Sequence, residues 1–324
     1  MTSQNLAQPR VVGVYEEIAA PPGRLKHSLL WLRRLVREKP LAAVGLFIFS
    51  TMVFLALFAD LVAPHHYRES SIEVRLLGPS ISHPFGTDDL GRDLLSRIIY
   101  GARVSTFVAV GAVVWGTGMA TMFGVVSAYV GGKFDLIFQR ITDAWLSIPW
   151  LLLMMTIVIM LPDESPVGGL SAENWGILRV IIALGIGDMA WASRVIRGAA
   201  LSVKENTYIE AARALGVPGR RIILRHILPN IIAPVIIMAT LGLGFAILSE
   251  ASLSFLGLGV PPPAPSWGGM MQDRARQHFV SAPWLAIFPG LAITVAVFGI
   301  NMLGDGLRDM LDPRLRGGRG GFGR

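Results

Sequence analysis

The side chains of this sequence that could perform chemistry are few and scattered. Its six histidines are spread along 324 residues without an H-E-x-x-H pair, and it has no cysteine. Only His65 and His66 are adjacent, at the end of the first long apolar run. Such a pair could hold a metal ion weakly, but two solvated side chains at an interface are the simpler interpretation. We therefore expect no metal site.

A glycine-rich stretch at 131–133 fails the test for a phosphate-binding loop. Ser127 stands where the first glycine of that loop is needed, and Phe134 stands where a Ser or Thr would hold magnesium. We therefore expect that the chain does not hydrolyse ATP, is not an enzyme by itself and binds no cofactor.

The composition indicates what kind of framework positions these residues. Hydrophobic residues make up 52% of the chain and charged residues 16%, and the mean hydropathy is +0.55. A soluble domain of this composition would have too little polar surface to cover itself. The sequence therefore predicts an all-α integral membrane protein that crosses the bilayer several times.

Six apolar runs approach or exceed the roughly 20 residues that a helix needs to span a bilayer. We expect transmembrane helices at 41–63, 104–128, 144–161, 176–193, 230–249 and 284–304. Small residues in these runs predict close helix packing. The glycines concerned are Gly111, Gly116, Gly118, Gly124, Gly185, Gly187, Gly242 and Gly244.

The positions of the cations predict the orientation. Most of the 29 basic residues lie before the first span, in the segment 194–229 or near the C-terminus. By the positive-inside rule both termini are then cytoplasmic. The expected order is a cytoplasmic segment 1–40, the first transmembrane helix 41–63, a periplasmic segment 64–103 and, at the end, a cytoplasmic tail 311–324. The net charge of +7 reflects this topology and contact with anionic lipid, so we expect no nucleic-acid partner.

Asp188 is the acidic residue placed most deeply in a predicted span. A charge at the centre of a span costs about 2.5–3.5 kcal/mol on insertion scales, so the side chain should face the bundle interior or a partner. It could contact a transported solute, or it could be a hydrogen-bonded structural acid. Both interpretations remain open at this point.

The basic segment 196–230 predicts two short helices joined by a turn. Thr207 and Glu210 have the spacing of a capping box, which predicts a helix that begins near Tyr208. Gly216 is suited to end that helix in the left-handed conformation. A second, arginine-bearing helix then runs toward Pro229. Neither helix is long enough to be stable alone in water, so the pair must pack on something.

The apolar face expected on the first helix is small. It consists of Tyr208, Ala211, Ala212 and Leu215. An amphipathic hairpin on the inner leaflet would account for the arginines as headgroup contacts. However, alanines bury little area in lipid and let another backbone approach closely, which favours a pocket in a partner protein.

Three motifs carry a resemblance to a known family. Glu210-Ala211-Ala212, Gly216 and Ile227-Leu228-Pro229 resemble the E-A-A…G…I-x-L-P loop of permease subunits of ATP-binding-cassette importers that work with an external binding protein. The isoleucine of the general pattern falls at His226, a variant familiar among peptide importers. The stretches 83–105, 251–271 and 303–316 resemble the C-type permease subunit of dipeptide, oligopeptide and nickel importers.

This resemblance implies an architecture and a set of partners. It implies a type I importer permease fold over 104–310, with a coupling loop at 194–229, in the bacterial cytoplasmic (inner) membrane. The partners are a second, B-type permease subunit in a heterodimer, two ATPase subunits that carry ATP and magnesium, and an extracytoplasmic solute-binding protein. The cargo class is peptides, with nickel or another small solute as the alternative.

The resemblance also implies site residues. The ATPase-coupling residues are Tyr208, Glu210, Ala211, Ala212, Arg213, Leu215 and Gly216. The outer segments 64–103 and 250–283 should face the binding protein, with a short interfacial helix near 272–278.

Two other classes compete with this interpretation. A secondary transporter or channel that uses an ion gradient would carry the basic segment as a lipid-surface hairpin. One central acid without paired buried charges speaks against it. An intramembrane enzyme would need a metal or nucleophile constellation, and the sequence offers none.

Overall fold

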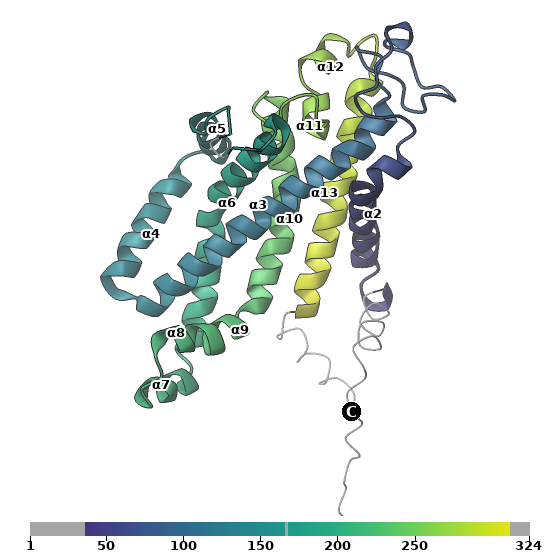
Figure 1. The fold of residues 1–324 in the computed structure, drawn as a ribbon. Helices are drawn as coiled ribbons and strands as arrows, with labels where there is room; N and C mark the ends of the chain where they lie inside the picture. The colour runs from purple at the N-terminus through teal and green to yellow at the C-terminus, as the bar shows by residue number, and fades with distance from the viewer. Residues whose placement is uncertain (1–35, 166–167, 312–324) are drawn as a thin grey trace, which may run out of the picture.

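The computed structural model describes residues 36–165 and 168–311 of the chain, mostly as helices, with longer connecting segments at 63–93 and 256–266. Expectations for 1–35 and 312–324 lie outside the described residues. The elements, drawn in Figure 1, are α2 (Pro40–Val62), η1 (Ile72–Val74), α3 (Leu94–Val130), α4 (Gly132–Ser147), α5 (Trp150–Met160), α6 (Ala172–Lys204), α7 (Thr207–Ala214), α8 (Gly219–Ile222), η2 (Ile223–Ile227), α9 (Leu228–Asn230), α10 (Ile232–Phe255), α11 (Trp267–Met270), α12 (Asp273–Gln277) and α13 (Trp284–Leu311).

Five helices of the described residues are long and apolar enough to cross a bilayer: α2, α3, α6, α10 and α13. They confirm five of the predicted spans, but α3 and α6 are longer than their apolar runs. α3 begins at Leu94, so residues 94–103 of the expected outer segment 64–103 are already helical. The side chain of Asp93 accepts a hydrogen bond from the backbone N–H of Ser96 and so starts this helix ten residues early.

The prediction of a continuous span at 144–161 is wrong. α4 ends at Ser147, α5 begins at Trp150, and the two helices are bent by 97°. Pro149 has no N–H to continue the helix, and its ring forces Ile148 into an extended conformation with φ −82° and ψ 130°. If the bent pair counts as one broken span, the described residues contain six spans, and otherwise five.

α3 and α6 form the most extensive helix pair, and glycines set their separation. A Cβ built on Gly116 would lie 2.8 Å from the carbonyl oxygen of Gly185, and one on Gly124 would lie 2.6 Å from that of Ser193. The backbones therefore touch where a side chain would hold them apart. Gly118 is an exception to the predicted packing, because a Cβ there would meet no atom within 4 Å.

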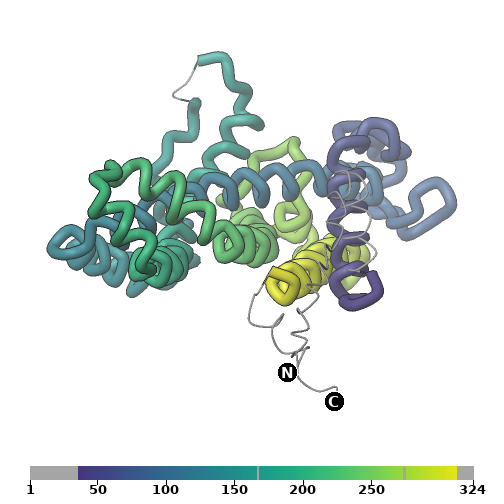
Figure 2. Tube along the Cα trace, turned by 90° about the horizontal axis from the view of Figure 1, so that it is seen from below, coloured from purple at the N-terminus to yellow at the C-terminus, as the bar shows by residue number. Residues whose placement is uncertain are grey.

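The two ends of the bundle differ. The start of α2, the end of α13 and the loop between α6 and α10 lie at one end, whereas α11, α12 and the segment 63–93 lie at the other (Figure 1). At the first end, Lys39 Nζ donates to Asp309 Oδ2 at 2.5 Å and so joins α2 to α13. Figure 2 shows the α6–α10 loop on the side of this end that faces away from α2 and α13.

Candidate functional site

The loop between α6 and α10 is a compact hairpin of residues 205–231, which we call the α7–α9 hairpin. It contains α7, α8, η2 and α9, and it projects from the end of the bundle (Figure 1). The expected helix-turn-helix at this position is confirmed. α7 begins within one residue of the predicted start at Tyr208.

The predicted capping box at the start of α7 is wrong. Thr207 is already the first helical residue, and the N-cap is Asn206, which makes no side-chain cap hydrogen bond. The Asn206 amide instead donates backward to the carbonyl of Val203 at 3.0 Å, which ties α7 to the end of α6. Glu210 is therefore not held in a cap, and it lies on the exposed face of α7.

The end of α7 is a Schellman motif, as the glycine predicted. Gly216 has a φ of 75°, a left-handed conformation that favours glycine. The N–H of Val217 donates to the Ala212 carbonyl at 3.1 Å, and the N–H of Gly216 donates to the Arg213 carbonyl at 2.9 Å. These two bonds close the helix and turn the chain sharply toward α8.

α7 has an inner and an outer face, and the predicted apolar face mixes the two. Ile209 is fully buried and Ala212 is only 8% exposed, because both pack into a cluster with side chains of α3, α6 and α8. Tyr208 is 43% exposed and Leu215 is 84% exposed. The placement of Ala212 beside them on one free face was therefore wrong. Ala212 follows Ile209 by three residues and is buried with it. Leu215 follows three residues later but is exposed, because it is the C-cap, where the chain leaves the helix.

Tyr129, at the end of α3, holds the hairpin in place. The Arg213 guanidinium lies over its ring, 5.1 Å from the centroid. A Cβ at Gly219 would come within 2.9 Å of the same ring, so α8 rests directly on it. Lys204 Nζ adds a hydrogen bond of 2.7 Å to the Ala128 carbonyl. Sequence reasoning missed Tyr129, because nothing local links it to a helix about eighty residues later.

An ion pair braces the helices above the hairpin. Arg197 of α6 donates through Nε to Asp135 Oδ1 of α4 at 2.6 Å, and the Ser127 hydroxyl donates to the same oxygen at 2.5 Å. The side chains of Arg197 and Asp135 are 25% and 16% exposed. A charge-assisted pair that is largely shielded from water resists separation better than a surface pair. The hairpin therefore stands on a rigid junction of α3, α4 and α6.

Two acids inside the bundle have different surroundings. Asp188 of α6 is half-buried and has no hydrogen-bond or ion-pair partner within the described parts of the chain. Glu250 of α10 is completely buried and accepts hydrogen bonds from Ser254 Oγ at 2.6 Å and Ser105 Oγ at 3.3 Å. Sequence reasoning missed Glu250, although Ser254 follows it by one helical turn. Glu250 is thus a hydrogen-bonded buried acid, whereas Asp188 has no such bond among the described residues.

The opposite end carries a cavity of about 480 Å³ lined by both charged and apolar residues. Asp88, Arg92, Arg97 and Arg179 line it together with the proline-rich loop after α10. Asp88 Oδ2 accepts from Arg92 Nε at 2.6 Å and lies 3.7 Å from Arg97 Nε. The short helix expected near 272–278 is confirmed as α12.

Comparison with known proteins agrees with these features. A family model described as binding-protein-dependent transport system inner membrane component matches residues 120–317. A second model, the N-terminal transmembrane domain of oligopeptide transport permease C, matches residues 30–79. Both matches agree with the resemblance seen in the motifs.

Relatives match along most of their length. The dipeptide transport system permease protein of Alkalihalophilus pseudofirmus is 43% identical over 87% of this chain and 88% of its own. The glutathione transport system permease protein of Escherichia coli is 39% identical over 88% of this chain and 90% of its own. The chain has a bundle of long apolar helices with the α7–α9 hairpin at one end, and it belongs to the inner-membrane permease components of binding-protein-dependent transport systems.

Proposed function

We propose that this chain forms, with a second permease subunit, the membrane pathway of an ATP-driven importer for peptides that an extracytoplasmic binding protein delivers. Two ATPase subunits supply the energy, and ATP and magnesium bind to them and not to this chain. The observation that carries the proposal is the exposed outer face of α7 on a hairpin that is itself firmly packed. The family supports this class of importer over an ion-gradient transporter or channel.

The charge distribution supports an orientation with both termini in the cytoplasm. The hairpin shares its end of the bundle with the start of α2 and the end of α13 (Figure 1). That end carries Arg37, Lys39 and Arg308 as well as the arginines of the hairpin. A cytoplasmic location of this end satisfies the positive-inside rule.

The hairpin has the properties that a coupling element needs. Tyr208, Ala211 and Leu215 present apolar surface, and Glu210 adds a carboxylate beside it. A partner that docks on α7 would bury this surface. Closure of the ATPase pair on ATP can shift the permease between states only if the joint moves as one body. Tyr129 joins the hairpin to α3, and behind it Asp135 of α4 binds Arg197 of α6 and Ser127 of α3.

The docking proposal is tested with an arginine placed on the outer face. Leu215→Arg should leave the chain inserted and reduce co-purification of the ATPase subunits, because a charge replaces a side chain that is 84% exposed and free to be buried by a partner. Val36→Arg is the matched control, since Val36 is also exposed, at 53%, and lies beside the start of α2. Equal recovery of ATPase subunits with both variants would contradict docking through α7.

Peptide cargo is supported by the relatives, whose names include dipeptide and glutathione transport. The test is uptake of a labelled dipeptide into cells that lack this chain and into cells that regain it. Uptake should return with the intact chain and stop when ATP hydrolysis by the partner subunits is blocked. Restored uptake of Ni²⁺ without restored peptide uptake would establish the alternative cargo.

Asp188 is the pathway residue in this proposal. Asp188→Asn keeps the shape of the side chain and removes its charge, so peptide uptake should show a raised KM at normal chain abundance. A structural role predicts the reverse pattern, a lower melting temperature of the purified chain with unchanged KM.

A further inference from the structure

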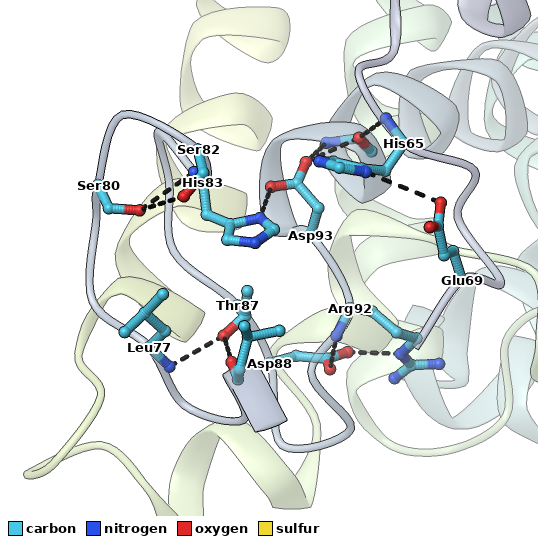
Figure 3. A network of polar contacts seen from close by, with 12 residues as sticks. His65, Glu69, Leu77, Ser80, Ser82, His83, Thr87, Asp88, Arg92 and Asp93 are labelled. Atoms are coloured by element: carbon cyan, nitrogen blue, oxygen red, sulfur yellow. Dashed lines mark hydrogen bonds and ion pairs between the residues drawn. The ribbon is translucent and has the colours of Figure 1, made fainter. Parts of the chain in front are cut away.

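Three potential metal ligands from distant positions meet in the segment between α2 and α3. His65, His83 and Asp93 each offer one ligand atom, and these atoms all lie within 4.8 Å of one another. Figure 3 shows them together where the segment folds back onto the start of α3. Two imidazoles and one carboxylate are a ligand set typical of zinc sites in proteins.

The two oxygens of Asp93 have separate tasks. Oδ2 accepts from the backbone N–H of Ser96 at 2.8 Å and from its hydroxyl at 2.7 Å, so it caps α3. Oδ1 lies 3.0 Å from His83 Nδ1. The side chains of Asp93 and His83 are only 1% and 13% exposed, so this half of the cluster is held in place. Oδ1 can therefore bind a cation without loss of the helix cap.

His65 completes the cluster from the other side. Its backbone N–H donates to the Ser96 hydroxyl at 3.0 Å, which places the residue next to the cap. Its Nδ1 lies 3.7 Å from Glu69 Oε2, so Nε2 is the nitrogen left for a ligand (Figure 3). In many metal sites one ring nitrogen of a histidine binds the metal and the other contacts a carboxylate, which fixes the tautomer of the ring.

The adjacent His66 belongs to a different contact. Its ring centroid lies 4.6 Å from that of Tyr67 and 5.7 Å from that of Tyr100. The pair of neighbouring histidines in the sequence is therefore no ligand pair. The ring of His65 lies instead 5.3 Å from that of His83, eighteen residues further on.

We propose that His65, His83 and Asp93 bind Zn²⁺, with water at the fourth position. A tetrahedral site with zinc–ligand bonds of about 2.0–2.1 Å places its ligand atoms about 3.3 Å apart. The His83 Nδ1 to Asp93 Oδ1 separation of 3.0 Å is already close to this value. The His65 side chain is 37% exposed and can move the short remaining distance. Zinc thus replaces the hydrogen bond between His83 and Asp93 by two metal–ligand bonds, and His83 Nδ1 gives up its proton to water while Nε2 stays protonated.

Bound zinc would close this outer segment into a loop. His65 follows α2 directly, His83 lies in the middle of the segment, and Asp93 precedes α3. A metal that joins three such points restrains the chain between them, because free motions of the loop would have to break metal–ligand bonds. The segment would then resist proteolysis at Arg68 and Arg75 when zinc is present.

The test uses the purified full chain in detergent, stripped of metal with a chelator and titrated with Zn²⁺ alone. Equilibrium dialysis with elemental analysis should find one zinc per chain. His65→Ala and His83→Ala should each weaken binding by about tenfold or more. Asp93→Asn keeps an oxygen to cap α3 and should weaken zinc binding in the same way. Trypsin cleavage at Arg68 should slow with zinc in the unaltered chain but not in these three variants.

His66→Ala is the matched control, because it removes a neighbouring imidazole that lies outside the cluster. Its zinc affinity should equal that of the unaltered chain. Melting curves without metal identify any variant that fails to fold. Zinc binding that survives both His65→Ala and His83→Ala in folded protein, or that His66→Ala weakens equally, would overturn the proposal. So would equal protection from trypsin by Mg²⁺, which does not prefer imidazole ligands.

Discussion

The Arg213 guanidinium lies over the ring of Tyr129, 5.1 Å from its centroid, so a residue of the α7–α9 hairpin rests on the last turn of α3. This contact turns a short surface helix into an extension of the transmembrane bundle. Movement of α7 by a partner is then passed to α3, and through the α3–α6 interface to the centre of the bundle. Three predictions concern this joint, and a fourth concerns the interface behind it.

Tyr129→Ala should uncouple transport from ATP hydrolysis. The substitution removes a cation–π contact worth roughly 0.5–2 kcal/mol and the ring on which Gly219 rests. ATPase subunits should still co-purify, since the outer face of α7 is unchanged, but peptide uptake should fall at least severalfold. Tyr129→Phe keeps the ring and should transport normally. If Tyr129→Ala transports as well as Tyr129→Phe, the ring is not the support inferred here.

Gly216→Pro should abolish transport through the backbone alone. Proline cannot adopt the φ of 75° observed at this position, and it removes the N–H that donates to the Arg213 carbonyl. The end of α7 must therefore rearrange, and the turn toward α8 is lost. Gly216→Asn is the matched control, because asparagine tolerates the left-handed region and a Cβ here would meet no atom within 4 Å. Uptake should therefore survive in Gly216→Asn and be lost in Gly216→Pro.

Ala211→Arg and Ala212→Arg should fail for different reasons. Ala211 is exposed on the outer face, so its substitution should leave the chain stable and weaken recovery of the ATPase subunits. Ala212 is 8% exposed within the cluster under the hairpin, so arginine there should lower the chain's own melting temperature. Thermal melting and co-purification, measured on both variants, separate the effects. Identical behaviour of the two variants would mean that the two faces of α7 do not differ.

Gly116→Ala should destabilise the chain, whereas Gly118→Ala should not. A methyl group at Gly116 would lie 2.8 Å from the Gly185 carbonyl oxygen, and neither backbone can yield without separation of α3 from α6. Overpacking of this kind costs about 1–3 kcal/mol. At Gly118 the methyl group meets nothing within 4 Å, so only the better helix propensity of alanine remains, a gain of up to about 1 kcal/mol. Measured in one detergent, the melting temperature should fall for Gly116→Ala and should rise or stay unchanged for Gly118→Ala.

The candidate site could be predicted from the sequence where its signals are local. Gly216 indicated the end of α7, Pro218 and Gly219 indicated a turn, and the small residues Ala211 and Ala212 indicated close approach by another backbone. The sequence could not show which alanine lies on the exposed face of α7, because Ile209 is buried only through its contacts with α3 and α6. It also placed the cap of α7 one residue late, since Asn206 bonds backward to α6.

Composition and hydropathy by themselves determined that this protein is a bundle of membrane-spanning helices. A chain in lipid must satisfy its own backbone hydrogen bonds, and a long apolar run does so within itself only as a helix. The tertiary structure alone decided which distant groups meet. It joined Tyr129 to Arg213, Asp135 to Arg197, and His65 to His83 and Asp93. Such pairs depend on how long helices cross and where loops fold back, and neither is encoded in the spacing of neighbouring residues. The break between α4 and α5 divides the same way: Pro149 is a helix-ending signal in the sequence that hydropathy passes over, whereas the bend of 97° comes only from the tertiary structure.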